Sequence, residues 1–293
     1  MPIKISACTF LRNAEMLCYP YIESILSILD YVDEFVINVG QSEDNTLAKI
    51  ESLALNNQKI RIIHSIWNEN MQAKGFVYAQ QKMIAQYNCT GDWVFYLEAD
   101  EILHDDDAKN LRETIHKYHN NAQVEALAFK YYHFYGAPYL IARSPAWYRS
   151  EVRIIRNNIR TYAPDGLFWV VMDKHRKARY PRAVLLDIYI YHYGHIRNLE
   201  SMQMKASQVS KYWSHEAPKI NYSNIDAQII KPWHGNHPNI IKDWLKTHAQ
   251  KLWKHNPNYK ISTREKKHRL SMLLEKWFNL DLSKKHYKKI NLK

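Results

Sequence analysis

Two carboxylates separated by one residue are the part of this sequence best suited to chemistry. Glu98 and Asp100 come directly after an apolar run, Trp93 to Leu97, which follows a Gly-Asp pair. Such a run is typical of a buried strand in an α/β sheet, and ligands bind beyond the carboxyl ends of such strands. Because side chains alternate along a strand, Glu98 and Asp100 are expected to point the same way.

Two carboxylates that point together repel each other unless a cation or a proton lies between them. Mg²⁺ and Mn²⁺ prefer oxygen ligands and often share them with the phosphates of a substrate. The spacing therefore predicts a divalent-metal site for a nucleotide diphosphate. A strand end that is capped by two solvated acids is the alternative that spacing alone leaves open.

The composition is that of a globular protein with a basic tail. The 293 residues are 46% hydrophobic, which is enough for one large α/β domain with an appendage. The formal net charge is +12, and residues 246–293 hold 14 Lys and Arg against 3 Asp and Glu, a net charge of +11. A basic tail usually meets an anionic surface, either lipid headgroups or nucleic acid.

The cysteines and the amino terminus predict a cytoplasmic protein. Cys8, Cys18 and Cys89 have no metal-binding spacing, which favours a reducing compartment over a disulfide scaffold. The amino terminus does not resemble a signal peptide, and no run of about 18 apolar residues could span a membrane. The basic tail is the segment expected to attach the protein peripherally to the inner face of the cytoplasmic membrane.

Strand and helix patterns alternate along the first hundred residues. Apolar runs predict strands over residues 3–10, 34–39, 60–66 and 93–97, and helical periodicity predicts helices over residues 21–29, from near 46, and 76–87. This alternation implies a mainly parallel sheet.

The second half of the chain predicts more strands and then helices. Strands are expected over residues 126–133, 152–156, 167–172 and 184–193, with an aromatic loop between the first two, and helices over residues 107–118, 240–253 and 262–280. The clearest boundary lies near residues 215–235. We therefore expect a catalytic domain over 1–215 and a basic, amphipathic helical extension over 216–293.

Six short segments stand in a particular order along residues 3–250. They are Ile5–Phe10 with Arg12-Asn13-Ala14-Glu15, Val36–Gly40 with Ser42, Asp44 and Thr46, Gly91–Glu101, Trp147-Tyr148 with Arg153–Asn157, His192–Arg197 with Met202, Lys205 and Tyr212-Trp213, and Pro232–Gly235 with His237-Pro238. In this order they resemble the family 2 glycosyltransferases. The resemblance implies a GT-A fold, a mainly parallel, Rossmann-like α/β sheet flanked by helices, and an inverting sugar transfer that builds surface polysaccharide or lipopolysaccharide core.

The resemblance also implies a Mn²⁺ or Mg²⁺ site. Asp100 is the first expected ligand. Glu98 stands where the family usually has Asp, and it would contact the metal directly, through water or through the ribose. His192 is the third expected ligand and His195 its substitute, although a half-buried strand histidine is the alternative for His192. The cation would stabilise the charge on the leaving diphosphate.

An acceptor hydroxyl needs a general base on the face opposite the diphosphate. Asp173 follows a predicted strand and fits the family position best. Asp165 is the second candidate, although it is equally typical of an ordinary turn. Glu101 is expected to bind the donor or acceptor sugar, or else to support the metal loop.

The remaining donor contacts are expected near the ends of the first two strands and on two arginines. Asp44 either bonds the base or caps a helix, and the arginines either offset the diphosphate charge or form structural ion pairs. The full set of residues expected to bind the nucleotide sugar is Thr9, Arg12, Asn13, Asn38, Asp44, Glu98, Arg153 and Arg197.

The expected partners are a nucleotide-diphosphate sugar, with a UDP-sugar first, a glycan or lipid-linked acceptor, and an anionic membrane surface reached through residues 246–293. A nucleotidyltransferase is one alternative, but residues 9–15 contain no Gly and only Arg12, unlike a phosphate-gripping loop. A nucleic-acid-binding protein is another, with aromatic residues of the tail as stacking platforms. Because Trp277 and Phe278 follow a helical apolar stripe, burial or membrane contact is favoured over nucleic acid.

Overall fold

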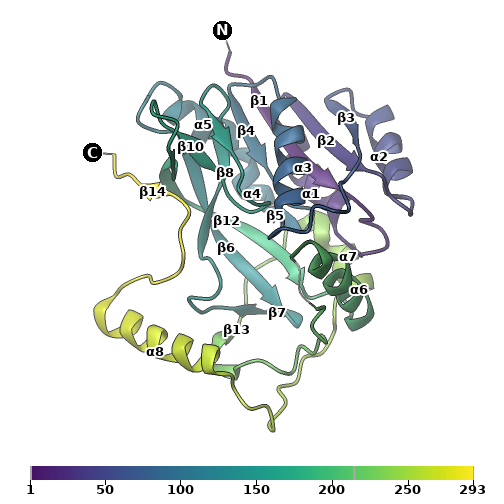
Figure 1. Ribbon diagram of the computed structural model, residues 1–293, viewed down its shortest axis with the longest axis vertical. Helices are drawn as coiled ribbons and strands as arrows, with labels where there is room; N and C mark the ends of the chain where they lie inside the picture. Colours follow the sequence, from purple (N-terminus) through teal and green to yellow (C-terminus); the bar gives the residue numbers. More distant parts are fainter. Residues whose placement is uncertain (1, 214–215, 293) are drawn as a thin grey trace.

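The computed structural model describes residues 2–213 and 216–292, and its centre is an eleven-stranded mixed sheet (Figure 1). The predicted strands of the first hundred residues lie parallel to one another in the order β3-β2-β1-β4. They and the helices between them are β1 (Ile5–Leu11), α1 (Tyr21–Leu29), β2 (Glu34–Gly40), α2 (Thr46–Leu55), β3 (Ile60–Ser65), α3 (Phe76–Tyr87) and β4 (Trp93–Tyr96).

The second half of the chain continues the sheet past β4 with strands of both directions. β8 and β6 follow in antiparallel pairs, and β12 then runs parallel to β6. The elements are β5 (Glu101–Leu103), α4 (Asp105–Lys109), α5 (Leu111–His119), β6 (Ala126–Tyr135), β7 (Ala137–Ala142), β8 (Ser150–Arg156) and β12 (Arg182–His195). A separate small sheet consists of β9 (Thr161–Tyr162), β10 (Val170–Met172) and β11 (Ala178–Arg179).

The parallel strands are buried because apolar layers pack on both faces of the sheet. Ile5 and Ala7 of β1 belong to the same buried cluster as residues of α1, whereas Cys8 belongs to a second cluster with residues of α3. Successive side chains of a strand point to opposite faces, so a strand covered on both sides must be apolar throughout. Because both faces of β4 are packed, the strand has a fixed position, and Glu98 and Asp100 follow directly after its carboxyl end.

The aromatic segment after residue 133, predicted as a loop, is a hairpin. β6 continues to Tyr135, Gly136 turns the chain with a φ of 70°, and β7 pairs back with β6. Glycine adopts this left-handed conformation without a steric penalty, and the aromatic and β-branched residues around it favour extended backbone. The loop prediction was therefore wrong up to Ala142, whereas residues 143–149, with Trp147 and Tyr148, do form a loop.

The helix predicted over 240–253 is also shorter than expected. A 3₁₀ turn η3 (Asn239–Ile241) leads into α7 (Lys242–His248), after which Ala249 takes an extended conformation. Ala249 forms a β-bridge with Arg197, and Gln250 donates its backbone N–H to the carbonyl of Ile196. This pairing ends the helix and leaves Leu252 exposed.

The C-terminal part of the chain leaves the body and then returns to it. It follows α6 (Leu199–Ser210) and the 3₁₀ turn η1 (Lys211–Trp213), and it comprises η2 (Ala227–Ile229), β13 (Ile230–Pro232), η3, α7, α8 (Thr263–Phe278) and β14 (Lys288–Lys289). β14 pairs with the start of β12. The predicted boundary at residue 215 lies outside the described residues, so the division into two domains stays a prediction.

Candidate active site

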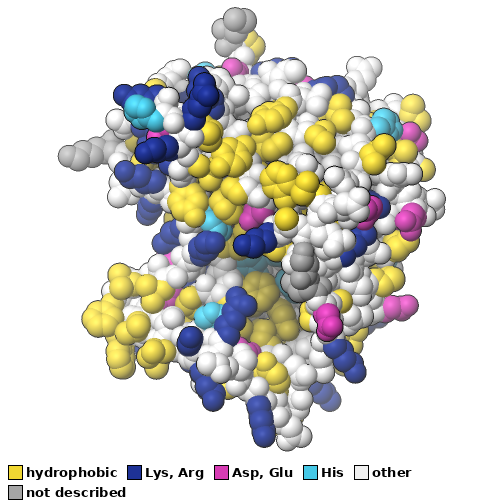
Figure 2. Space-filling view, viewed as in Figure 1, with side chains coloured by type: hydrophobic (Ala, Val, Ile, Leu, Met, Phe, Trp, Pro, Cys, Tyr) yellow, Lys and Arg dark blue, Asp and Glu magenta, His cyan; other side chains and the backbone are white. Residues whose placement is uncertain are grey.

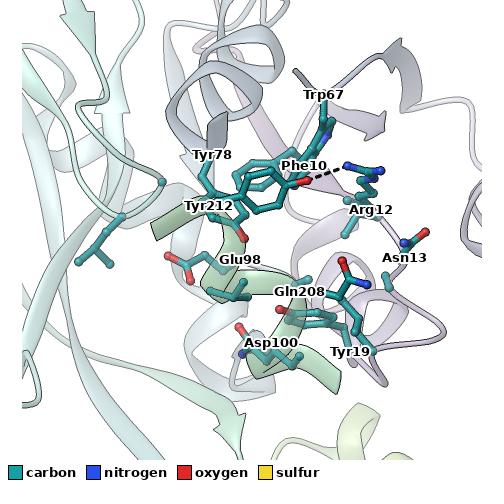
Figure 3. Close-up of a pocket in the computed structure, with 18 of the residues that line it drawn as sticks. Phe10, Arg12, Asn13, Tyr19, Trp67, Tyr78, Glu98, Asp100, Gln208 and Tyr212 are labelled. Atoms are coloured by element: carbon teal, nitrogen blue, oxygen red, sulfur yellow. Dashed lines mark hydrogen bonds and ion pairs between the residues drawn. The ribbon is translucent and has the colours of Figure 1, made fainter. Parts of the chain in front are cut away.

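A pocket of about 330 Å³ opens where β1 and β4 end (Figure 3). The carboxyl ends of parallel strands meet at one edge of a sheet, which brings the segments after β1 and β4 together. The pocket is lined by residues 10–14, Glu98–Asp100, Asp165–Leu167, His192, and residues of α6 and η1 that include Lys205, Gln208 and Tyr212.

One wall of the pocket is aromatic. Trp67, Tyr78 and Tyr212 pack against one another with ring centroids 5.5–5.6 Å apart, and Phe10 lies 5.9 Å from Trp67. The Arg12 guanidinium sits over the Trp67 ring and donates a 2.8 Å hydrogen bond to the Tyr212 hydroxyl. This wall offers flat apolar surface with one cation beside it, the combination that suits a planar heterocycle.

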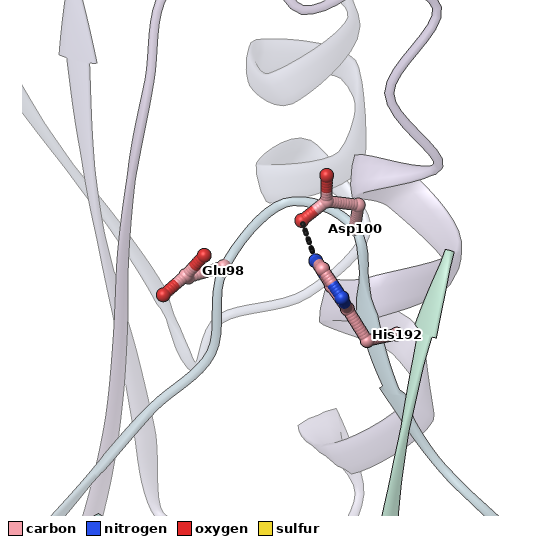
Figure 4. A group of neighbouring side chains, drawn as sticks. All are labelled: Glu98, Asp100 and His192. Carbon is pink, nitrogen blue, oxygen red and sulfur yellow. Dashed lines mark ion pairs between the residues drawn. The ribbon is translucent and has the colours of Figure 1, made fainter. Parts of the chain in front are cut away.

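Glu98, Asp100 and His192 lie together at the pocket and form a candidate cation site (Figure 4). One ligand atom from each lies within 4.8 Å of the others, and Nε2 of His192 is 3.5 Å from Oδ1 of Asp100. Two carboxylates and an imidazole are a donor set that fits Mn²⁺, and the carboxylates suit Mg²⁺. His195, the expected substitute, lies outside this group and packs its ring edge-to-face against Trp147.

Hydrogen bonds set the tautomer of His192. Nε2 of His133 lies 2.7 Å from the carbonyl oxygen of Tyr148, which can only accept, so that nitrogen carries a proton. Burial holds the pKa of His133 well below its usual range, so the ring is neutral and its Nδ1 must accept. The donor to it, at 2.8 Å, is Nδ1 of His192. In the neutral His192 ring, Nε2 therefore carries the lone pair and faces Asp100, as a metal ligand requires.

Replacing His133 by Phe is expected to weaken Mn²⁺ binding by about 10- to 100-fold, as the loss of a partner behind a ligand commonly does. Phe retains a ring in the buried position but cannot accept the proton of His192. Mn²⁺ titrations followed by electron paramagnetic resonance measure the effect. His237→Phe, a ring outside the cation site, is the control, and equal affinities for the two variants would contradict the tautomer assignment.

Two cations hold the other oxygen of Asp100. Nζ of Lys205 is 2.9 Å from Oδ2, and Nη2 of Arg197 is 3.3 Å from it. Burial alone would raise the pKa of Asp100, but Lys205, His192 and Arg197 together hold it well below its usual range. Lys205 lines the pocket, whereas Arg197 is fully buried behind Asp100. Of the two roles expected for Arg197, this placement favours the structural ion pair over a diphosphate contact.

The sequence model of Glycosyl transferase family 2 matches residues 6–168, more than half of the chain. The chain belongs to this family. The mixed, mainly parallel sheet with flanking helices confirms the GT-A-type α/β fold that was expected. No curated protein matches the chain significantly.

Solved structures similar to this family 2 chain include residues 1–349 of S. aureus TarS, with 15% identity and a TM-score of 0.41 over 72% of this chain and 65% of that one. The same TarS segment in complex with UDP-GlcNAc gives 16% identity and a TM-score of 0.40, over 72% of this chain and 66% of that one. The mannosyltransferase PcManGT from Pyrobaculum calidifontis, in complex with GDP-Man and Mn²⁺, gives 16% identity and a TM-score of 0.33, over 46% and 36%. The chain thus spans less than two thirds of the length of these structures.

Beneath the cation site, this family 2 chain holds a fully buried ion pair. Nε and Nη2 of Arg153 each lie 2.7 Å from an oxygen of Glu101, which also accepts a 2.9 Å hydrogen bond from the Tyr131 hydroxyl. Nη2 of Arg153 reaches Oε1 of Glu98 at 2.9 Å. Neither Arg153 nor Glu101 lines the pocket, and the two charges neutralise each other. Of the two roles expected for each residue, this placement favours the structural ion pair for Arg153 and support of the metal loop for Glu101.

Glu98 stands between this pair and the pocket. Burial and the neighbouring Glu101 raise the pKa of Glu98 to about 7. A cation beside a carboxylate favours its ionised form. Binding of a metal ion is therefore expected to lower the pKa of Glu98.

Of the two candidate bases, Asp165 lies at the pocket and Asp173 does not. Oδ1 of Asp165 accepts a 2.8 Å hydrogen bond from the backbone N–H of Leu167, which orients the carboxylate. Asp173 closes the turn between β10 and β11 and accepts 2.8 Å hydrogen bonds from two backbone N–H groups. Asp173 was favoured because it follows a predicted strand and fits the family position; it does follow β10, but β10 belongs to the separate small sheet and Asp173 does not line the pocket.

Three residues that were expected to contact the nucleotide, Thr9, Asn38 and Asp44, do not line the pocket. Asn38 is buried and donates to the backbone and side chain of Gln81, and Thr9 is buried below the pocket. Asp44 accepts hydrogen bonds from the backbone N–H groups of Thr46 and Met16 and so secures the start of α2. Of the expected donor-binding residues, those that line the pocket are Arg12, Asn13 and Glu98.

Lys82 of α3 supports the loop that carries Asp165. Its ammonium group is fully buried, 3.8 Å from the centre of the Trp169 ring and 4.2 Å from that of Tyr96, and it donates to the carbonyls of Gly166 and Leu167 at 3.2 and 3.1 Å. Burial, together with the nearby charge of Arg153, lowers the pKa of Lys82 to about 7.

The stability advantage of the wild type over Lys82→Met is expected to rise with pH. The unfolded chain binds a proton on Lys82 below pH 10.5, whereas the folded chain does so only below about 7. Between these values the unfolded state holds more protons, so raising the pH from 7 to 10 stabilises the wild type by about 3–4 kcal/mol. Urea unfolding of both proteins from pH 7 to 10 measures the difference, and a difference independent of pH would contradict the assignment.

Proposed function

We propose that this family 2 member transfers a sugar from a nucleotide-diphosphate sugar to a hydroxyl group of a glycan or lipid-linked acceptor. One observation carries the proposal: Glu98, Asp100 and His192, which together could hold a cation, lie at the pocket that has the aromatic wall. A nucleoside diphosphate needs both features, since its base is flat and its phosphates are anionic.

The donor is expected to lie along the pocket from the aromatic wall to Asp100. Its base packs against Trp67 and Tyr78, with Arg12 beside it, and its diphosphate points to Lys205. A Mn²⁺ or Mg²⁺ ion held by Asp100, His192 and Glu98 would stabilise the negative charge on the departing diphosphate. Lys205 adds a positive charge in the same place.

Asp165 is the proposed general base. Its carboxylate takes the proton of the acceptor hydroxyl while the hydroxyl oxygen attacks the anomeric carbon from the face opposite the diphosphate. The bond to the anomeric carbon forms as the bond to the diphosphate breaks, so the configuration inverts. Lys82 and the Leu167 N–H hold the loop that carries this carboxylate.

The test is a panel of UDP-, GDP-, dTDP- and CMP-linked sugars, with Mn²⁺, Mg²⁺ or chelator. We expect one donor class to release its nucleotide product and transfer its sugar, and nuclear magnetic resonance of the product to show inversion. Release of pyrophosphate from a nucleoside triphosphate and a sugar 1-phosphate, tested beside the panel, would instead favour a nucleotidyltransferase. If no donor reacts under any metal condition, the proposed transfer is wrong.

The variants Asp165→Asn and Asp173→Asn form a matched pair for the general base. Asp165→Asn is expected to lower the rate of transfer by about 10²-fold with donor affinity unchanged, because a general base contributes at least this much. Asp173→Asn is expected to retain the wild-type rate, since its carboxylate serves a turn. Steady-state kinetics measure both, and the reverse pattern would restore Asp173 as the base.

A further inference from the structure

Helix α8 presents its polar side to the protein and its apolar side to solvent. On the inner side, Arg269 forms two hydrogen bonds with Asp226, at 2.7 and 2.8 Å, and Glu275 pairs with Arg149, at 2.7 and 2.8 Å. Met272 packs between them against a small apolar cluster. Surface helices ordinarily bury their apolar stripe and expose their charged one, so this arrangement is inverted.

The outer side of α8 and the turn after it form a continuous apolar surface. Leu270, Leu273, Trp277 and Phe278 are 48–71% exposed, and no residue of the helix is buried. Leu280 and Leu282 extend this surface beyond the end of the helix. We call these six residues the outer α8 surface. Figure 2 shows hydrophobic side chains gathered at the lower left, over the place that α8 occupies in Figure 1.

The charge around the outer α8 surface is positive. The three acids of the tail serve the protein itself: Glu275 holds Arg149, Glu265 caps the helix, and Asp281 pairs with Lys285. From α8 to β14, in the part of the chain that the structure describes, no ion pair is formed by the exposed lysines Lys266, Lys267, Lys276, Lys284, Lys288 and Lys289. The surface thus combines exposed large apolar side chains with uncompensated cations.

We propose that the outer α8 surface docks on an anionic lipid bilayer, with α8 lying in the plane of the interface. Amphipathic helices with Trp, Phe and Leu on one side and Lys around it bind such surfaces through apolar burial and headgroup attraction together. No helix among the described residues is long and apolar enough to cross a membrane.

Charge complementarity selects lipid over the other occupants. A second copy of the chain would bring the same basic surface against itself, and the lysines would repel one another. The phosphates of a nucleic acid would neutralise the charge of the lysines, but they offer no apolar surface that could bury Leu270 and Leu273. An anionic bilayer supplies both negative charge and hydrocarbon. The docking does not depend on the proposed sugar transfer.

The experiment is co-sedimentation of the full chain with lipid vesicles. One set consists of phosphatidylcholine alone and the other contains 30% phosphatidylglycerol, so that the two sets differ in the charge of the lipid surface. The wild type is expected to bind the anionic vesicles, and less so as salt rises. The double variant Leu273→Glu/Trp277→Glu is expected to lose at least 10-fold in affinity. Leu55→Glu/Ile66→Glu, which alters exposed apolar residues elsewhere, is the matched control and should bind like the wild type.

Further measurements distinguish failure of the docking proposal from failure of the proposed sugar transfer. The Leu273→Glu/Trp277→Glu variant is expected to release nucleotide from the donor in solution at the wild-type rate, because α8 does not line the pocket. Absence of vesicle binding by the wild type, or an equal loss in the control, would overturn the docking. A wild-type dimer in solution that this variant makes monomeric would assign the surface to a second copy. RNA binding lost in the same variant would assign it to nucleic acid.

Discussion

Replacing Asp100 by Asn is expected to lower the rate of sugar transfer by at least about 10³-fold. The substitution keeps the shape of the side chain but removes its negative charge. The carboxylate is the first expected metal ligand, and it also pairs with Lys205 and Arg197. A metal ion commonly contributes several kcal/mol to stabilising the charge of a transition state, and each 1.36 kcal/mol is a factor of ten in rate. Steady-state kinetics at saturating Mn²⁺, with Mn²⁺ titrations beside them, give the measurement.

The control for Asp100→Asn is Asp187→Asn, which makes the same chemical change on a side chain that is 88% exposed. It is expected to have wild-type activity. Circular dichroism is needed for both variants, since Asp100 also balances the buried Arg197. A folded Asp100→Asn protein that retains a tenth of the wild-type rate would contradict the role of this carboxylate.

Replacing Arg153 by Met is expected to destabilise the fold by about 3–5 kcal/mol. Arg153 and Glu101 are both fully buried, and removal of the guanidinium leaves the Glu101 carboxylate without its charge partner in the core. Breaking one side of a buried ion pair costs about this much, whereas replacing both sides often costs little. Urea unfolding measures the free energy.

The double variant Arg153→Met/Glu101→Gln separates the lost charge partner from lost packing. It is expected to recover a large part of the stability that Arg153→Met loses, because no buried charge remains. Arg112→Met, which removes an exposed partner of Asp33, is the control and should cost no more than about 1 kcal/mol. If Arg112→Met and Arg153→Met were equally destabilising, the buried pair would not support the metal loop as described.

The elements with strong periodicity were predictable from the sequence, and the pairing between distant segments was not. The helices α1 and α3 have the predicted bounds because their apolar spacing and local signals agree. The hairpin at Gly136 was missed, since its turn depends on one glycine within an aromatic run. The early end of α7 follows from a bridge between Ala249 and Arg197, which no local signal announces.

The same division holds for the candidate site. Glu98 and Asp100 could be found because they follow a buried strand directly, and His192 because it belongs to a family segment. Trp67 lies in a segment with no motif, and the contact of His133 with His192 joins two strands across 59 residues. The sequence left two roles open for Arg153, a diphosphate contact or a structural ion pair, because it does not show which acid lies beside the guanidinium in the fold.

The measurement that tests the central claim most directly is thermal unfolding of the wild type and of Asp100→Asn. UDP, GDP, dTDP and CMP are each added with Mn²⁺, Mg²⁺ or chelator. A ligand at 100 times its dissociation constant stabilises the folded state by about 2.7 kcal/mol, which a melting curve resolves readily. We predict that one nucleotide raises the midpoint only with a metal ion, and that Asp100→Asn loses the effect. If no nucleotide shifts the wild-type midpoint under any metal condition, the account of the pocket as a metal-assisted nucleotide-sugar site is contradicted.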